Sequence, residues 1–225
     1  MKKDSKTEMP RQIIQRRLLS AEAADVLREK IVEGEFAQGF KLIEEELSQM
    51  LGVSRACIRE AVMQLENEGL AVRGEGRSRE VTTFKKADIR EIYMLRLCIE
   101  KLAVAECLNR GNVPLAALRK KGGQILRLVN KKPIDSVRLT EADLDFHETL
   151  IAAAGSRAMQ VWQGLKYQIK TLLLLYFKTT PNEPSPDDYA NHDRIIEALQ
   201  SGDKAQAEAL LEAHILSGMD TLLRQ

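Results

Sequence analysis

The segment that decides the fold is EEELSQMLGVSRACIREAVMQLENEGL, residues 44–70. Its first part predicts a short helix over 44–51, which ends at Gly52 because glycine readily adopts the left-handed conformation that terminates a helix. Ser54 offers a hydroxyl that can cap a second helix, and Gly69 predicts its end. Between them, apolar residues at helical spacing predict one buried face: Ile58, Ala61, Val62 and Leu65. Two helices joined by a tight glycine-containing turn are typical of a helix-turn-helix.

The residues on either side complete this domain. Upstream, residues 21–33 predict another helix, with Ala24, Leu27 and Ile31 on one face and a stop at Gly34. Downstream, LAVRGEGRSREVTT, residues 70–83, places short β-prone ends around a glycine-containing turn, which predicts a small hairpin. We therefore predict a winged helix-turn-helix over 20–83.

The second helix of the pair carries groups that could read DNA. Arg55 and Arg59 are four residues apart and share one face, opposite the apolar stripe, and an arginine can bind guanine with two hydrogen bonds. Ser54 at the cap leaves backbone N–H groups for a phosphate. The hairpin adds arginines as a wing would: Arg73, Arg77 and Arg79. Residues 1–82 hold 14 basic and 15 acidic residues, so on these residues alone a surface helix with ordinary arginines is an equal alternative.

Everything after Thr83 is predicted to be helical. Glycine, proline or asparagine separates segments of helical period at 86–110, 114–130, 138–154, 157–178, 186–200 and 203–223. The shift in composition at 82–86 marks a domain boundary, which gives an all-α helical bundle over 84–225 and a mainly α protein. Residues 1–17 carry six basic and two acidic residues, and we interpret 1–19 as a flexible, solvated tail in preference to a DNA-reading arm.

Composition narrows the class of protein. With 225 residues, 44% of them hydrophobic, the chain can bury a core. No apolar run approaches the length of a membrane helix, and the N-terminus carries no apolar region of a signal peptide. The protein is therefore expected to be cytoplasmic, with no membrane partner. A net charge of +1 argues against a generally basic nucleic-acid coat protein.

The three histidines of the chain all lie on apolar-patterned helices of the second domain. Asp143 precedes His147 by four residues, so both project from one helical face and could bind one ion. His192 and His214 belong to two other predicted helices, and a bundle that joins these helices would gather one aspartate and three histidines in its interior. Spacing alone leaves a second interpretation open, in which these histidines are ordinary core residues.

The DNA-binding part resembles a known family. The stretch from Leu27 to Leu70, with LGVSRACIREAVMQLENEGL at its end, resembles the GntR family of winged-helix repressors. The resemblance implies that DNA is contacted by Ser54, Arg55, Arg59, Gly76 and Arg77. The sequence departs from the family at Ala56-Cys57, where Thr-Pro or Thr-Thr is usual, and at Glu45, where a basic residue is frequent. These departures bear on the operator sequence.

The helical part is similar to the FCD effector domain of the FadR-type GntR subgroup. The similarity rests on VTTFKKADIREIYMLRLCIEKLAVAECL (81–108), DLDFHETLIAAAGS (143–156) and NHDRIIEALQSGDKAQAEALLEAHI (191–215). It implies a divalent transition metal, zinc or nickel by the preference of imidazole ligands, at Asp143, His147, His192 and His214. It also implies a small carboxylate effector bound with the help of Arg96. Arg96 and Glu100 are four residues apart, so a plain surface ion pair is the alternative interpretation.

These features together predict a bacterial transcription regulator, expected to be a repressor. A homodimer would bind double-stranded operator DNA, and a small organic acid in the helical domain would control its affinity. The main alternative is a metal-dependent hydrolytic enzyme that uses the same aspartate and histidines. No fourth histidine is present to act as a general base, which makes this alternative the weaker one. A protein-interaction module without DNA binding is a third possibility.

Overall fold

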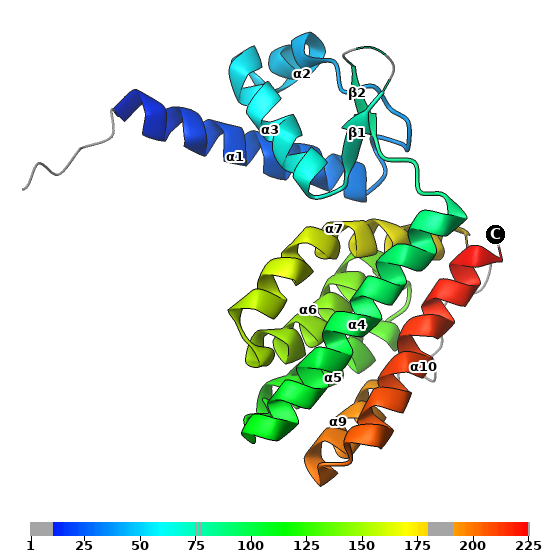
Figure 1. The fold of residues 1–225 in the computed structure, drawn as a ribbon. Coiled ribbons are helices and arrows are strands. Elements are labelled where there is room, and N and C mark those ends of the chain that lie inside the picture. The colour runs from blue at the N-terminus through cyan, green and yellow to red at the C-terminus, as the bar shows by residue number, and fades with distance from the viewer. Residues whose placement is uncertain (1–10, 75, 77, 180–190, 225) are drawn as a thin grey trace, which may run out of the picture. The chain divides into compact units, whose positions relative to one another are not determined.

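The computed structural model describes residues 11–74, 76, 78–179 and 191–224. The chain divides into two compact units between Thr83 and Phe84. The first unit contains α1 (Arg11–Val32), α2 (Glu44–Leu51), α3 (Arg55–Asn67), β1 (Ala71–Arg73) and β2 (Arg79–Val81). Helices α1 and α2 both pack against α3, and the two strands form an antiparallel hairpin (Figure 1). This order of elements is that of a winged helix-turn-helix, as predicted.

The turn between α2 and α3 follows from local chemistry. Gly52 ends α2 with φ of +66°, a left-handed conformation in which a side chain would strain the backbone. The Ser54 hydroxyl accepts a hydrogen bond from the Cys57 backbone N–H at 3.2 Å and so caps α3. The apolar stripe of α3 then faces the domain core, where Ile58 and Leu65 are fully buried.

Helix α1 begins earlier than the sequence predicted. It starts at Arg11, inside the segment expected to be a flexible tail, so residues 11–19 are helical and that part of the prediction is wrong. Arg16 forms an ion pair with Glu60 of α3, and the Ser20 hydroxyl bonds to the same carboxylate at 2.7 Å. These contacts anchor the N-terminal turns of α1 to α3. Residues 1–10 lie outside the described residues.

The hairpin is short. Ala71 pairs with Val81 and Arg73 with Arg79, and Lys41 forms an isolated bridge to Glu80. Gly76, near the tip, has φ of +72°. Arg77, which the family resemblance implies as a wing contact, lies outside the described residues.

The second unit is a helical bundle. It comprises α4 (Lys86–Arg110), α5 (Leu115–Val129), α6 (Ser136–Ala154), α7 (Ser156–Thr179), α9 (Asn191–Ser201) and α10 (Lys204–Leu223). Trp162, Phe146 and Leu118 are fully buried in its core. The helix predicted over 186–200 is seen from Asn191, and residues 180–190 are not described. Among the described residues, no helix is long and apolar enough to cross a membrane.

Three pairs of neighbouring helices bring the functional residues together. Helix α4 packs against α6 and α10, and α9 packs against α10; Figure 1 shows α4 and α10 lying side by side. Asp135 caps α6 by accepting a hydrogen bond from the Arg138 backbone N–H at 3.0 Å, and Asp203 caps α10 in the same way through Gln206 at 2.9 Å. The caps define where these two helices begin.

Candidate functional site

The aspartate and histidines singled out in the sequence meet at one point in the second unit. Asp143 and His147 come from α6, His192 from α9 and His214 from α10. One ligand atom from each lies within 4.8 Å of all the others. The bundle therefore brings together all four predicted metal ligands, although they span residues 143–214 of the chain.

The distances show that the nitrogen and oxygen donors converge. His147 Nε2 lies 3.3 Å from His214 Nε2, and His192 Nε2 lies 3.1 Å from Asp143 Oδ1. His147 Nε2 and Asp143 Oδ2 are 3.8 Å apart. Three imidazole nitrogens and a carboxylate oxygen that point at one another form a donor set that fits a divalent transition ion.

The surroundings favour the protonation states that a metal requires. Burial alone would raise the pKa of Asp143, but the hydrogen bond with His192 and the neighbouring histidine and arginine charges outweigh it and hold that pKa far below its ordinary range. Burial and the nearby histidines lower the pKa of His214 well below its ordinary value. Burial also lowers the pKa of His147, against the opposing effect of Glu100. An ionised carboxylate and neutral imidazoles are the forms that bind metal.

Arg96 and Glu100 lie beside this cluster and not on the surface. Arg96 is 2% exposed and Glu100 is fully buried, so the surface ion pair weighed from the sequence is wrong. Arg96 Nε donates to Glu100 Oε1 at 2.8 Å, while Glu100 Oε2 lies 2.5 Å from His147 Nδ1. Burial would raise the pKa of Glu100, but His147 and Arg96 outweigh it and lower that pKa below its ordinary value. The sequence did not indicate that Glu100 contacts His147.

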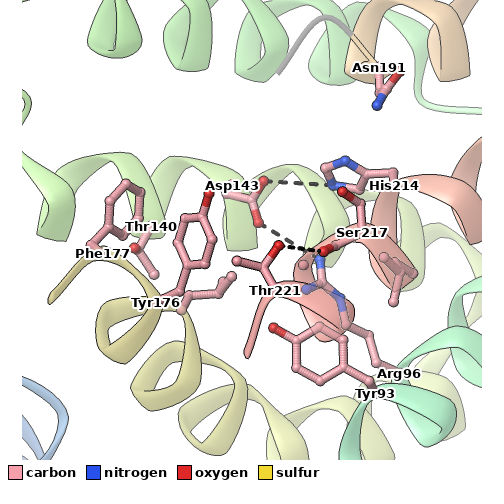
Figure 2. A pocket seen from close by; sticks show the side chains of 13 residues that line it. Tyr93, Arg96, Thr140, Asp143, Tyr176, Phe177, Asn191, His214, Ser217 and Thr221 are labelled. Atoms are coloured by element: carbon pink, nitrogen blue, oxygen red, sulfur yellow. Dashed lines mark hydrogen bonds and ion pairs between the residues drawn. The ribbon is translucent and has the colours of Figure 1, made fainter. Parts of the chain in front are cut away.

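A cavity of about 210 Å³ opens beside the cluster. Figure 2 shows dashed lines from the Asp143 carboxylate to Arg96 and to His214; Arg96 Nη2 lies 3.8 Å from Asp143 Oδ2, and His214 Nε2 lies 3.9 Å from Asp143 Oδ1. Aromatic side chains of α7, Tyr176 and Phe177, form part of the wall. The cavity therefore combines charged groups with an apolar surface, as a site for a small organic anion would.

Three buried polar atoms in this wall have no hydrogen-bond partner among the described residues: Tyr93 Oη, Arg96 Nη2 and Thr140 Oγ1. Buried polar groups are nearly always paired, and each group left unpaired costs about 1–3 kcal/mol. Burial raises the pKa of Tyr93 to about 12, so its hydroxyl keeps its proton. Sequence reasoning missed Tyr93 and Thr140, although each precedes a predicted site residue by three positions on the same helix.

The candidate DNA-reading residues cluster in the first unit. Ser54 caps α3, and the side chains of Arg55 and Arg59 are 61% and 59% exposed on its first turns. Each arginine is paired with an acid of α2: Arg59 Nε lies 3.0 Å from Glu44 Oε1, and Arg55 contacts Glu45. In the hairpin, Arg79 Nε lies 3.3 Å from Oε1 of Glu66 on α3.

Two family models match the chain. Residues 19–81 match the bacterial regulatory proteins of the gntR family, and residues 91–217 match the FCD domain. The first match covers α2, α3 and the hairpin, and the second covers the cluster and all of its cavity lining except Gly218 and Thr221. Together they account for most of the described residues of both units, except 11–18, 82–90 and 218–224.

The chain is similar to several transcription regulators. The gluconate operon transcriptional repressor of Bacillus licheniformis is 30% identical over 201 residues, which cover 87% of this chain and 81% of that protein. The regulator LutR of Bacillus subtilis (strain 168) is 27% identical over 215 residues, 85% of this chain and 95% of LutR. The probable D-xylose utilization operon transcriptional repressor of Paenarthrobacter nicotinovorans is 24% identical and covers 89% of this chain and 87% of its own.

Solved structures share the fold. A putative transcriptional regulator GntR from Rhodococcus sp. RHA1 matches with a TM-score of 0.75 at 21% identity, over 91% of this chain and 97% of that one. McbR/YncC of E. coli matches with a TM-score of 0.71 at 19% identity, over 92% and 98%. At these identities the likeness concerns the fold alone.

Proposed function

Since the chain belongs to the GntR family of bacterial transcription regulators and carries an FCD effector domain, we propose that it represses its target genes until a small carboxylate binds in the cavity of the second unit. DNA binding and effector binding are the functions of these two domains. The nature of the effector, the metal and the dimer are the parts that we add. A metal-dependent hydrolase, the alternative left open by the sequence, finds no support among these relatives.

The observation that carries the proposal is the cavity with its unpaired polar atoms. Arg96 Nη2 is a charged donor without a hydrogen-bond partner among the described residues, and it lies next to the candidate metal ligands. A carboxylate is the acceptor that an arginine binds most strongly. Tyr93 Oη and Thr140 Oγ1 could then bind further oxygens of the same molecule. An acid with hydroxyl groups near its carboxylate satisfies all three atoms, and the similarity to a gluconate operon repressor supports this choice.

Zinc or nickel would be held by Asp143, His147, His192 and His214. These four side chains form the convergent donor set. An octahedral ion accepts more ligands than these four, which leaves room for an oxygen of the effector. The ion would supply positive charge that attracts the anionic effector. Arg96 would orient the effector carboxylate, and the aromatic wall of α7 would exclude water from it.

Operator DNA would be bound by a homodimer. One recognition helix reads too few base pairs for useful specificity, and a two-fold protein reads a pseudo-palindromic site. Ser54, Arg55 and Arg59 are the proposed contacts of α3, with Gly76 and Arg77 of the wing. The outer surface of α4 supports dimerisation in the second unit, because it leaves large apolar side chains exposed at Met94, Leu95 and Leu102.

A gel-shift titration tests the proposal. The metal-loaded protein is mixed with DNA from directly upstream of its own gene, with unrelated DNA of equal length as the control, and then with gluconate, lactate or acetate. We expect the upstream fragment to be bound preferentially and a hydroxy acid to weaken this binding by about 5–150-fold, the usual range of allosteric coupling. Equal binding of both fragments would contradict a specific regulator. Tighter binding with a hydroxy acid would reverse the sign of regulation.

A further inference from the structure

We infer that Glu100 is a positioning residue that orients the metal ligand His147 and the effector-binding Arg96 at the same time. The inference rests on the proposed function in taking the aspartate and histidine cluster as a metal site. It adds a residue that belongs to neither proposed ligand set, and it assigns each oxygen of one buried carboxylate a separate task.

The geometry around Glu100 leaves little freedom. Its side chain is fully buried on α4, with Oε1 2.8 Å from Arg96 Nε and Oε2 2.5 Å from His147 Nδ1. An ionised carboxylate only accepts hydrogen bonds. Both neighbours must therefore donate, and neither oxygen can exchange its partner without leaving a buried donor unpaired.

For His147, this contact selects the tautomer. Because Nδ1 donates to Glu100, the proton of the neutral ring lies on Nδ1, and Nε2 carries the lone pair. That nitrogen faces the cluster, 3.3 Å from His214 Nε2 and 3.8 Å from Asp143 Oδ2. A carboxylate behind a histidine ligand fixes the ring and raises its basicity, and loss of such a partner typically weakens metal binding 10–100-fold.

For Arg96, the contact decides which nitrogen faces the cavity. Glu100 occupies Nε, while Nη2 remains without a hydrogen-bond partner among the described residues, 3.8 Å from Asp143 Oδ2. Through its two hydrogen bonds, Glu100 therefore turns the Nε2 lone pair of His147 toward the metal cluster. It also leaves the Nη2 N–H of Arg96 available for an anion beside that cluster.

Glutamine at this position would break one of the two contacts. Its side chain has the same shape, but it offers one acceptor and one NH₂ donor in place of two acceptors. If the NH₂ group faces His147, the ring must accept there and carry its proton on Nε2, the tautomer that cannot bind metal. If it faces Arg96, two donors oppose each other and the guanidinium loses its anchor.

The tautomer is measured first, in the wild-type protein without metal. With only three histidines in the chain, ¹⁵N-labelled imidazoles give a spectrum that His147→Gln assigns, because one ring disappears. We expect His147 to be protonated on Nδ1 and unprotonated on Nε2. A wild-type His147 with its proton on Nε2 overturns the inference, whatever any variant does.

Metal binding is measured next, by competition of zinc with a chromophoric chelator. We expect Glu100→Gln to bind zinc about 10–100-fold more weakly than the wild type and Glu100→Asp, which keeps the charge, to recover part of the loss. The matched control is Glu106→Gln, the same substitution at a half-exposed ion pair with Arg110 on the same helix, which should bind zinc as the wild type does.

The outcomes separate the two proposals. If the wild type binds no zinc or nickel, the proposed metal site is wrong, while the tautomer measurement still decides the role of Glu100 toward His147. Unchanged zinc affinity and an unchanged His147 tautomer in a folded Glu100→Gln protein would refute the positioning role and leave the metal site intact. Circular dichroism shows which variants are folded. If His147→Gln does not fold, His192→Gln and His214→Gln each remove one of the other rings and assign His147 by elimination.

Discussion

Arg55, the first residue of the proposed recognition helix, forms an ion pair with Glu45 on the first turn of α2. The two side chains are 61% and 48% exposed, so the pair itself contributes less than about 1 kcal/mol to stability. Its importance lies in DNA binding, because a phosphate that approaches Arg55 must compete with a carboxylate already in place. In the family that this segment resembles, a basic residue is frequent at the position of Glu45. The charge at this position is therefore reversed here.

We therefore predict that Glu45→Gln tightens DNA binding. Loss of the pair frees Arg55 and removes one negative charge near the phosphates, and an exposed pair of this kind accounts for up to about fivefold in affinity. The effect should shrink as salt rises, because exposed charges are screened. Fluorescence anisotropy with operator DNA at two salt concentrations measures it. Glu46→Gln is the control, since it removes the same charge one residue away from the pair. An equal gain in both variants would show that the effect comes from the change in net charge and not from the release of Arg55.

A second prediction concerns the arginines themselves. Arg55→Ala and Arg59→Ala should each weaken operator binding by about 1–3 kcal/mol, the free energy that a good bidentate contact to a base contributes. Both side chains are largely exposed, so helix content and melting temperature should stay near the wild-type values. Arg138→Ala in the second unit is exposed as well and serves as the control. Wild-type affinity in both α3 variants would mean that other residues face the DNA.

The sequence predicted the first unit well because its signals are local. Gly52 and Ser54 define the turn and the cap through their own backbone and hydroxyl, and the apolar stripe of α3 needs no knowledge of distant residues. The start of α1 was missed because it depends on a distant contact: Arg16 and Ser20 bond to Glu60 of α3. Pairs of that kind are not visible in a window of neighbouring residues.

In the candidate metal site, too, the sequence predicted what depends on neighbouring residues and missed what depends on distant contacts. Asp143 and His147 share a face by their spacing, whereas the addition of His192 and His214 from spacing was only one of two interpretations. A surface pair of Arg96 and Glu100 stayed open as an alternative because α4 carries apolar residues all round, so its pattern does not tell which face is covered. Only the packing of α6 against α4 places Glu100 behind His147.

Removal of the metal should loosen the second unit. The four ligands come from α6, α9 and α10, so an ion would cross-link three helices, and a ligand at 100 times its dissociation constant stabilises the folded state by about 2.7 kcal/mol. We predict a lower melting temperature after chelation and its recovery with zinc or nickel. Calorimetry with metal analysis measures both. His147→Ala and His214→Ala should lose the response; about one ion per chain in the double variant would show that the metal binds elsewhere.

The last prediction concerns Tyr93, whose hydroxyl is buried without a hydrogen-bond partner among the described residues. Tyr93→Phe removes an unsatisfied polar group, so the melting temperature of the effector-free protein should stay the same or rise. If the hydroxyl binds the effector, affinity for the acid should fall by about 2–13-fold, the equivalent of one hydrogen bond of 0.5–1.5 kcal/mol. Isothermal titration of the metal-loaded protein with the acid that releases DNA gives the affinity, and Tyr167→Phe, outside the cavity lining, is the control. A drop in stability with no change in effector affinity would show that Tyr93 supports the fold and does not touch the ligand.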